Sequence, residues 1–321
     1  MERELALELV RVTELAALSA SPWMGRGDKN SADGAATEAM RRMFDSVSIE
    51  GTVVIGEGEM DEAPMLFIGE EVGSGNGPKV DVAVDPLEGT EIVAKGLNNA
   101  MSVLAVAGKG QLLHAPDMYM EKLAVGPALA GKLNVLDPIR TTVEKAALAL
   151  GKPLSDLTVI LLDRDRHAEI TAELRAAGVR IKFLSDGDVA GAMAPSFPET
   201  GIDLYVGSGG APEGVLAAAA LKCLGGEIQG RLMPENDEQF QRCIDMGITD
   251  PRRVLTMDDM VGTGDVIFAA TGVTPGEFLG GVRYLPDQRA ETHSMVMRGK
   301  TRTIRYIKSL HYLPNKPLLR K

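Results

Sequence analysis

The sequence has very little cysteine and no pattern of residues typical of a zinc site. Only Cys223 and Cys243 occur in 321 residues, and they form neither a C-x-x-C pair nor the dense framework of a small secreted domain. The four histidines are scattered, without H-E-x-x-H spacing and without a cysteine companion. We therefore expect two reduced thiols and no zinc centre.

An excess of basic charge and long apolar runs are also lacking. The net charge of -11 argues against a nucleic-acid partner, because a phosphate backbone is normally met by a basic face. No uninterrupted apolar run is long enough to span a bilayer, and the opening residues Met1–Leu5 show no secretory apolar core. We expect a cytoplasmic protein without a membrane or nucleic-acid partner, for which a small phosphorylated substrate remains possible.

The chain shows neither internal repeats nor low-complexity linkers, and its length corresponds to roughly two domain-sized units. We expect a first unit over residues 1–150, with helices near 3–19 and 29–44. Short strands near 52–56, 80–85, 101–107 and 119–125 indicate an antiparallel sheet on which these helices stack. A helix over 138–151, opened by proline and closed by glycine, leads into the second unit.

The second unit, expected over residues 151–321, alternates strands and helices and thereby predicts mostly parallel strands in an α/β fold. Strands are expected over 157–162, 179–184 and 202–206, and helices over 167–177, 189–193 and 212–224. A hairpin around Arg298–Lys300 is expected in the tail, residues 257–321. The sequence does not decide which of the two sheets this tail joins.

One strand ends in residues suited to a metal site. Asp85-Pro86-Leu87-Glu88-Gly89-Thr90 follows an apolar strand, and its two carboxylates are hard oxygen ligands of the kind that Mg²⁺ and Mn²⁺ prefer. Taken alone, the same motif also describes an ordinary turn with solvated acids.

A second acidic cluster raises the case for metal. Glu57, Glu59 and Asp61 leave the end of the strand Val53–Ile55 together, and crowded carboxylates repel one another unless a cation joins them. Asp33 lies in the first turn of the preceding helix, where an acid also complements the helix dipole.

Polar clusters follow all three strands of the second unit. Because the carboxyl ends of parallel strands line the ligand crevice, we expect the clusters at one edge. Surface ion pairs, helix capping and glycine packing are the respective alternatives. The clusters are Asp163–Arg166, Ser185–Asp188 and Gly207–Gly210.

Together, the acidic clusters of the first unit and the glycine-rich cluster of the second resemble class II fructose-1,6-bisphosphatase. This family belongs to the superfamily of metal-dependent sugar and inositol phosphatases, and the resemblance covers nearly the whole chain. The resemblance implies a layered α-β-α-β-α sugar phosphatase fold that hydrolyses the 1-phosphate of fructose 1,6-bisphosphate in gluconeogenesis. It also implies a homo-oligomer, either a dimer or a tetramer. The residues that carry it are Lys29, Asp33, Gly56–Glu59, Asp85–Thr90 and Gly207–Gly214.

By resemblance, two or more Mg²⁺ or Mn²⁺ ions are bound: Asp33 and Glu57 hold one, and Asp85, Glu88 and Glu213 hold another. Thr90 orients the attacking water, Glu57 belongs to the catalytic set, and Asp61 or Glu59 assists as an outer carboxylate. The implied substrate contacts are Glu88, Gly89 and Thr90 at the scissile phosphate, Asp186, Gly187 and Asp188 at the sugar, Gly210 through its backbone, Tyr119, Arg164, Asp165 and Arg166 at the distal phosphate, and Lys29 as a further positive charge.

Two other functions stay open on sequence alone. A sedoheptulose-1,7-bisphosphatase, or a dual sugar bisphosphatase, satisfies the same groups, because its substrate also carries a second phosphate and similar hydroxyls. A non-catalytic sensor of metal or sugar phosphate would keep the carboxylates but has no need of Thr90, whose presence favours catalysis.

Overall fold

Two compact units share the chain. The computed structural model describes residues 4–58 and 64–316. One unit comprises Met1–Leu112 and Gly264–Lys321, and the other comprises Leu113–Thr263. The division differs from the expected boundary at residue 150, because the strand over residues 119–125 pairs with strands of the second unit.

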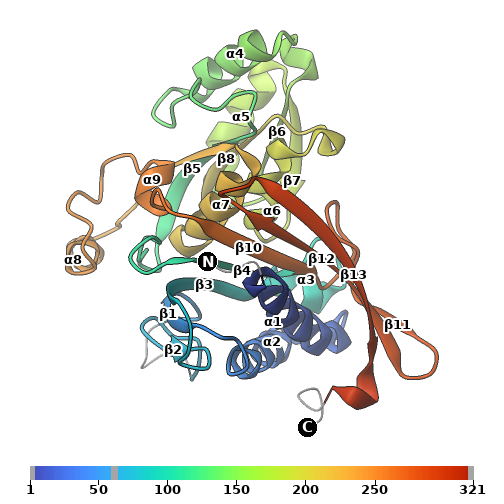
Figure 1. Cartoon of the computed structure of the whole chain (residues 1–321). Coiled ribbons are helices and arrows are strands. Elements are labelled where there is room, and N and C mark those ends of the chain that lie inside the picture. Colours follow the sequence, from blue (N-terminus) through green and yellow to red (C-terminus); the bar gives the residue numbers. More distant parts are fainter. Residues whose placement is uncertain (1–3, 59–63, 317–321) are drawn as a thin grey trace. The chain divides into compact units, whose positions relative to one another are not determined.

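The first unit is built on an eight-stranded sheet of order β11-β12-β10-β4-β3-β1-β2, with β13 paired to β12 (Figure 1). Its pairings are antiparallel except for β1 with β3. The strands of the tail therefore belong to the sheet of the N-terminal strands. The strands are β1 (Glu50–Ile55), β2 (Glu71–Val72), β3 (Lys79–Glu88), β4 (Met101–Gly108), β10 (Val266–Gly272), β11 (Arg283–Leu285), β12 (Arg289–Arg298) and β13 (Thr303–Tyr312).

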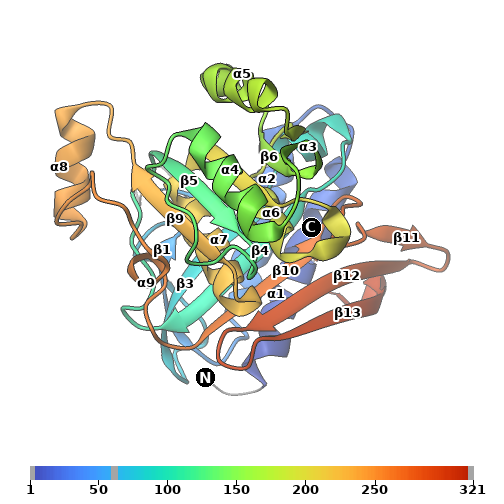
Figure 2. The same cartoon turned by 90° about the horizontal axis from the view of Figure 1, so that it is seen from above.

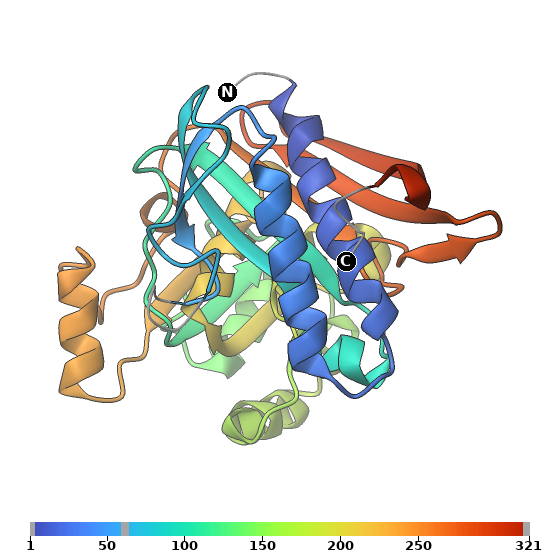
Figure 3. The ribbon, with the colours of Figure 1, turned by 90° about the horizontal axis from the view of Figure 1, so that it is seen from below.

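Two long helices, α1 (Leu5–Ala20) and α2 (Lys29–Phe44), lie side by side across one face of this sheet (Figure 3). Their apolar residues recur at helical spacing, and Leu9, Met40 and Phe44 are buried against valines of the strands. Asp28 caps α2 by accepting the Ser31 amide hydrogen at 3.0 Å. The unit also contains 3₁₀ turns at Ser21–Trp23 and Leu313–Asn315.

Buried hydroxyl groups dock α1 on the sheet. Thr13 of α1 is hydrogen-bonded to Thr271 of β10 at 2.8 Å, and Thr271 continues to Ser294 of β12 at 2.8 Å. At the next residue of α1, the buried carboxylate of Glu14 accepts from Thr292 of β12 at 3.1 Å. Because buried polar groups need partners of defined geometry, these bonds select one rotation of α1 against the tail strands.

Strand β3 continues past the point where the sequence suggests a turn. Pairing with β4 resumes at Glu88 after a register shift between Asp85 and Glu88. Pro86 has no amide hydrogen to give to the ladder, so it occupies the irregular stretch, as proline in a sheet does. Gly89, with a φ of 92°, then reverses the chain into α3 (Thr90–Lys95).

The second unit has a five-stranded sheet of order β7-β6-β8-β5-β9. Strand β6 is parallel to β7 and β8, as predicted, whereas β5 is antiparallel to β8 and β9. The mixed α/β class with two sheets is thus confirmed. The strands are β5 (Tyr119–Val125), β6 (Thr158–Leu162), β7 (Arg180–Leu184), β8 (Leu204–Gly210) and β9 (Glu227–Leu232).

Helices cover both faces of this sheet. Helices α4 and α5 share an apolar cluster with alternate residues of β5, β6 and β8, whereas α6 and α7 contact β5 and β8 (Figure 2). None of the helices in residues 4–58 and 64–316 is both long and apolar enough to cross a membrane. The helices are α4 (Ile139–Leu150), α5 (Ala168–Ala177), α6 (Val189–Met193), α7 (Ala211–Leu224), α8 (Asp237–Asp245) and α9 (Met257–Met260), with 3₁₀ turns at Leu154–Asp156, Asp165–His167, Ala194–Ser196 and Pro198–Thr200.

Gly56 offers a test of how the turn after β1 is built. A Cβ at this position would lie 2.0 Å from the Leu66 carbonyl oxygen, which accepts the Glu57 amide hydrogen. Gly56→Ala should therefore lower the free energy of unfolding by about 1–3 kcal/mol, measured by urea denaturation.

Gly34→Ala is the matched control, because a Cβ there meets nothing within 4 Å and the residue lies inside α2. It should leave stability unchanged or raise it by up to about 1 kcal/mol. Equal stability of the two variants would show that the Leu66 carbonyl does not constrain Gly56.

Candidate active site

Two acidic side chains meet in the first unit. Asp33 projects from the first turns of α2, and Glu57 follows β1. Burial raises the pKa of Asp33, whereas a hydrogen bond with the Glu57 side chain acts in the opposite direction. Two carboxyl groups this close share either a proton or a cation. The pair that the resemblance assigns to one metal is therefore brought together, and its oxygen donors suit Mg²⁺ or Mn²⁺.

Asp85 and Glu88 come from the irregular end of β3. A carboxylate oxygen of Asp85 lies within 4.8 Å of one of Glu88, and the Leu87 amide donates to Asp85 Oδ1 at 3.0 Å. Glu88 is buried, Asp85 is partly exposed, and Thr90 begins the following helix, α3. The register shift at Pro86 therefore gathers both acids and the hydroxyl within one short stretch of backbone.

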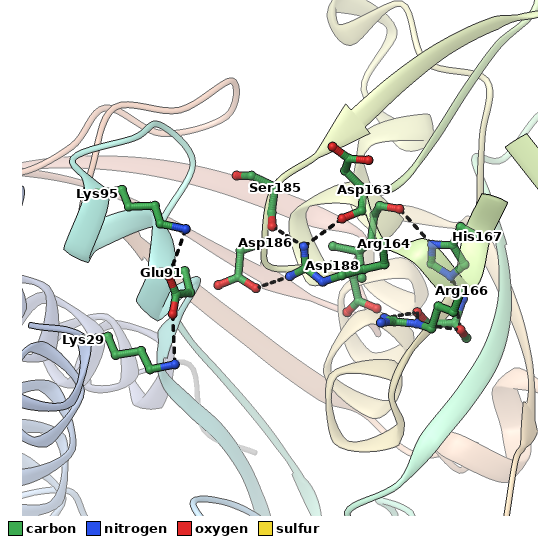
Figure 4. A network of polar contacts seen from close by, with 12 residues as sticks. Lys29, Glu91, Lys95, Asp163, Arg164, Arg166, His167, Ser185, Asp186 and Asp188 are labelled. Atoms are coloured by element: carbon green, nitrogen blue, oxygen red, sulfur yellow. Dashed lines mark hydrogen bonds and ion pairs between the residues drawn. The ribbon is translucent and has the colours of Figure 1, made fainter. Parts of the chain in front are cut away.

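Lys29 has an ion-pair partner in its own unit. Its ammonium group lies 2.9 Å from Glu91, which also binds Lys95 at 3.1 Å (Figure 4). Both lysines hold the pKa of Glu91 below its usual range. The positive charge expected of Lys29 at the substrate is thus shared with a neighbouring carboxylate.

Glu213, in the first turn of α7, has a buried oxygen without a partner. Its Oε2 atom accepts no hydrogen bond from any residue that the structure describes, and a Cβ on Gly210 would lie 1.9 Å from it. Burial raises the pKa of Glu213, which Lys122 opposes and Asp188 reinforces. A buried carboxylate oxygen without a donor is what a metal ligand looks like before the ion is bound.

Asp188, at the start of α6, is held by a buried cation. Its Oδ2 atom accepts from Lys122 at 2.7 Å and from the Tyr205 hydroxyl at 2.9 Å. Lys122 is 1% exposed and Asp188 is 4% exposed, so the pair is removed from water. Both bonds go to one carboxylate oxygen, which leaves Oδ1 without a hydrogen bond in the described chain and able to accept from a ligand.

Arg164 ties together two of the predicted polar clusters. It pairs with Asp186 at 3.0 Å and donates to the carbonyl oxygens of Ser185 and Asp163 at 2.6 and 3.0 Å (Figure 4). Asp186 and Asp188 flank Gly187, whose φ is 69°. The carboxyl ends of β6 and β7 are therefore joined, as expected for neighbouring parallel strands.

Arg166, by contrast, pairs with no carboxylate in the described part of the chain. Its guanidinium lies 4.6 Å from the Tyr119 ring centre and donates to the Ser208 carbonyl at 2.8 Å. Tyr119 is 44% exposed, and with Gly210 it lines a cavity of about 290 Å³. The group is an exposed cation held in place by neutral partners, which suits an anionic ligand. Asp165 precedes it and is exposed.

The comparison with known proteins decides the family. The sequence model of the family described as bacterial fructose-1,6-bisphosphatase, glpX-encoded, matches residues 3–311. The chain belongs to this family. It is 49% identical to fructose-1,6-bisphosphatase 1 class 2 of Escherichia coli K12, over 98% of the chain and 97% of the relative. It is 46% identical to the class 2 enzyme of Haemophilus influenzae, over the same shares.

Sequence reasoning did not find some of the residues that shape these clusters. Lys122 interrupts an apolar strand at a position in phase with buried Met120 and Ala124, and that phase was the available signal. Tyr205 and His167 carried no motif of their own, and Ser208 was noticed only as part of the Gly207–Gly210 cluster. Asp61 and Glu59, expected as outer carboxylates, lie outside the described residues.

The buried pair predicts a large loss of stability when it is broken. Lys122→Met leaves the Asp188 carboxylate buried without its cation, which should cost about 3–5 kcal/mol in the free energy of unfolding. Lys145→Met is the matched control, since Lys145 is 49% exposed and pairs at 2.7 Å with Asp137, whose carboxylate is 24% exposed. It should cost at most about 1 kcal/mol.

Both variants should be compared by urea denaturation, together with the double variant Lys122→Met, Asp188→Asn. The double variant should recover part of the stability lost in Lys122→Met, because the asparagine side chain that replaces Asp188 carries no charge and needs no cation. Similar losses for Lys122→Met and Lys145→Met would contradict the importance of burial for this pair.

Proposed function

We propose that the chain hydrolyses the 1-phosphate of fructose 1,6-bisphosphate to fructose 6-phosphate and phosphate, in gluconeogenesis. The family supports this reaction, since its members are phosphoric monoester hydrolases of this substrate. The observation that carries the proposal in the structure is the contact of Asp33 with Glu57. Two carboxyl groups held together by separate elements are a stable arrangement when a divalent cation lies between them.

The metal set comprises Asp33 and Glu57 on one ion, and Asp85 and Glu88 on another, with Glu213 as a further ligand of the second. Bound Mg²⁺ or Mn²⁺ would neutralise phosphoryl oxygens, acidify a water and stabilise the leaving alkoxide. A phosphate dianion otherwise repels any nucleophile, which is why its uncatalysed hydrolysis is so slow.

Thr90 is assigned to orient the attacking water, beside Glu88 and Gly89 at the scissile phosphate. The sugar hydroxyls would meet Asp186, Gly187 and Asp188, of which Asp188 offers its Oδ1 atom. Gly210 would contribute a backbone contact. The distal phosphate is assigned to Arg164, Asp165 and Arg166 with Tyr119. Lys29, which is paired with Glu91, would supply a further positive charge.

The substrate experiment is phosphate release from pure fructose 1,6-bisphosphate and pure sedoheptulose 1,7-bisphosphate, compared as kcat/KM at one metal concentration. We expect the fructose substrate to be preferred. A preference for sedoheptulose would assign the same site to the alternative sugar, and binding without turnover of either would favour the sensor. A cytoplasmic location and a dimeric or tetrameric assembly stay predictions.

Metal removal tests the carboxylate set. After rigorous chelation the protein should lose nearly all activity, and Mg²⁺ or Mn²⁺ should restore it, whereas Zn²⁺ should not be required. Isothermal titration of the chelated protein with Mn²⁺ provides a second readout. Full turnover without any divalent ion would exclude this assignment.

Thr90 should act mainly in the transition state. Thr90→Val removes the hydroxyl but keeps the shape, and we expect kcat to fall at least ~10²-fold with a smaller change in KM. Thr90→Ser keeps the hydroxyl and should retain more activity. A Thr90→Val enzyme with near-normal kcat would reduce Thr90 to a residue that only begins α3.

A further inference from the structure

The position of Arg166 depends on a single neighbouring peptide. Its Nε donates to Ser208 Oγ at 3.0 Å, and its Nη2 donates to the Ser208 carbonyl oxygen at 2.8 Å. Tyr119 supplies the ring beneath the guanidinium. Because no carboxylate of the described residues binds Arg166, Ser208 provides the only directional bonds that hold the charge in this part of the chain.

Ser208 is itself held by a buried imidazole. The Ser208 amide donates to His167 Nε2 at 2.8 Å, and Ser208 Oγ lies 3.1 Å from the same nitrogen. Since Nε2 accepts, the ring proton is on Nδ1, which donates to the Leu162 carbonyl at 2.8 Å. His167 is 4% exposed, so neither ring nitrogen has an equivalent bond to water as an alternative.

The surroundings keep the ring neutral. Burial lowers the pKa of His167, and the guanidinium groups of Arg166 and Arg164 lower it further, whereas the hydrogen bond that the ring donates to the Leu162 carbonyl oxygen acts to raise it. Protonated Nε2 would place one N–H group against another. The backbone is adapted to the ring as well, because Gly207 has a φ of 133° and a Cβ there would lie 3.1 Å from His167 Nε2.

We infer that His167, acting through Ser208, is a positioning residue for Arg166 and thereby sets the affinity for the distal phosphate of the substrate. The inference rests on the proposed function. His167 touches no reacting atom. Its Nε2 atom accepts from the Ser208 amide, while Arg166 donates to the carbonyl and hydroxyl oxygens of the same serine.

The chain of contacts predicts a selective loss. His167→Leu removes the acceptor, leaves the Ser208 amide buried without a partner and allows the peptide to shift. KM for fructose 1,6-bisphosphate should rise about tenfold with kcat changed much less, because a charge-assisted bond to the distal phosphate is weakened. For fructose 1-phosphate, which lacks the distal phosphate, KM and kcat of the variant should be nearly those of the unaltered protein.

Two further variants separate positioning from general damage. His167→Gln offers a side-chain carbonyl that can accept from the Ser208 amide, and should recover most of the lost affinity. His311→Leu is the matched control, because His311 is also buried, at 5% exposure, but is bound to Thr292 and faces Glu14 in the other unit. It should lower stability without the substrate-selective change in KM.

A double-mutant cycle decides the mechanism. In an Arg166→Ala background, His167→Leu should add no further increase in KM for the bisphosphate, since the residue that it positions is gone. Binding of fructose 1,6-bisphosphate to chelated protein, measured by calorimetry, should show the same pattern without turnover.

Additive effects in the cycle, or equal penalties on both substrates, would overturn the role of His167 even if Arg166→Ala alone is selective. Failure of the unaltered, metal-loaded protein to hydrolyse fructose 1,6-bisphosphate would instead overturn the proposed function, and the inference with it.

Discussion

Charge removed from water needs a partner, and the candidate site depends on how this chain meets that requirement. Lys122 and Asp188 satisfy it with each other, at 2.7 Å and almost fully buried. Asp33 and Glu57 meet as two acids, and Glu213 keeps one buried oxygen without a donor in the described chain. The first pair is complete by itself. Two acids in contact and a buried oxygen without a donor suit a divalent cation, which is why we assign these acids to metal.

The polar side chains of the candidate site lie where the regular backbone of a strand is interrupted or ends. In the first unit, a proline without an amide hydrogen occupies the register shift of β3, so Asp85 and Glu88 flank the irregular stretch and lie within reach of each other. In the second unit, the parallel strands β6 and β7 end at the same edge, and Arg164 joins the loops that follow them. The regular parts of the strands form the core, whereas the polar side chains of the candidate site lie at strand ends and at irregular positions.

The two arginines after β6 differ in whether a carboxylate compensates their charge. Arg164 is compensated by Asp186, whereas among residues 4–58 and 64–316 Arg166 is held by an aromatic ring and by the oxygens of Ser208 and by no carboxylate. A cation positioned by neutral groups keeps its attraction for an anion. The neutral His167 beneath Ser208 completes that arrangement without adding a competing charge.

Hydrophobic periodicity and turn signals in the sequence determined the mixed α/β class and nearly all of the long helices and strands, because these are local properties of the chain. The acids that we propose as metal ligands came from the resemblance to a family. That family followed from the strand-end motifs. Only the tertiary structure decided that the tail strands join β4 through β10, and that residues 113–150 belong with the second sheet, since strand pairing depends on partners far away in sequence. It also decided that Lys122 neutralises Asp188 and that His167 accepts from Ser208. Those contacts join residues 66 and 41 positions apart, and no local pattern specifies which buried side chains will meet.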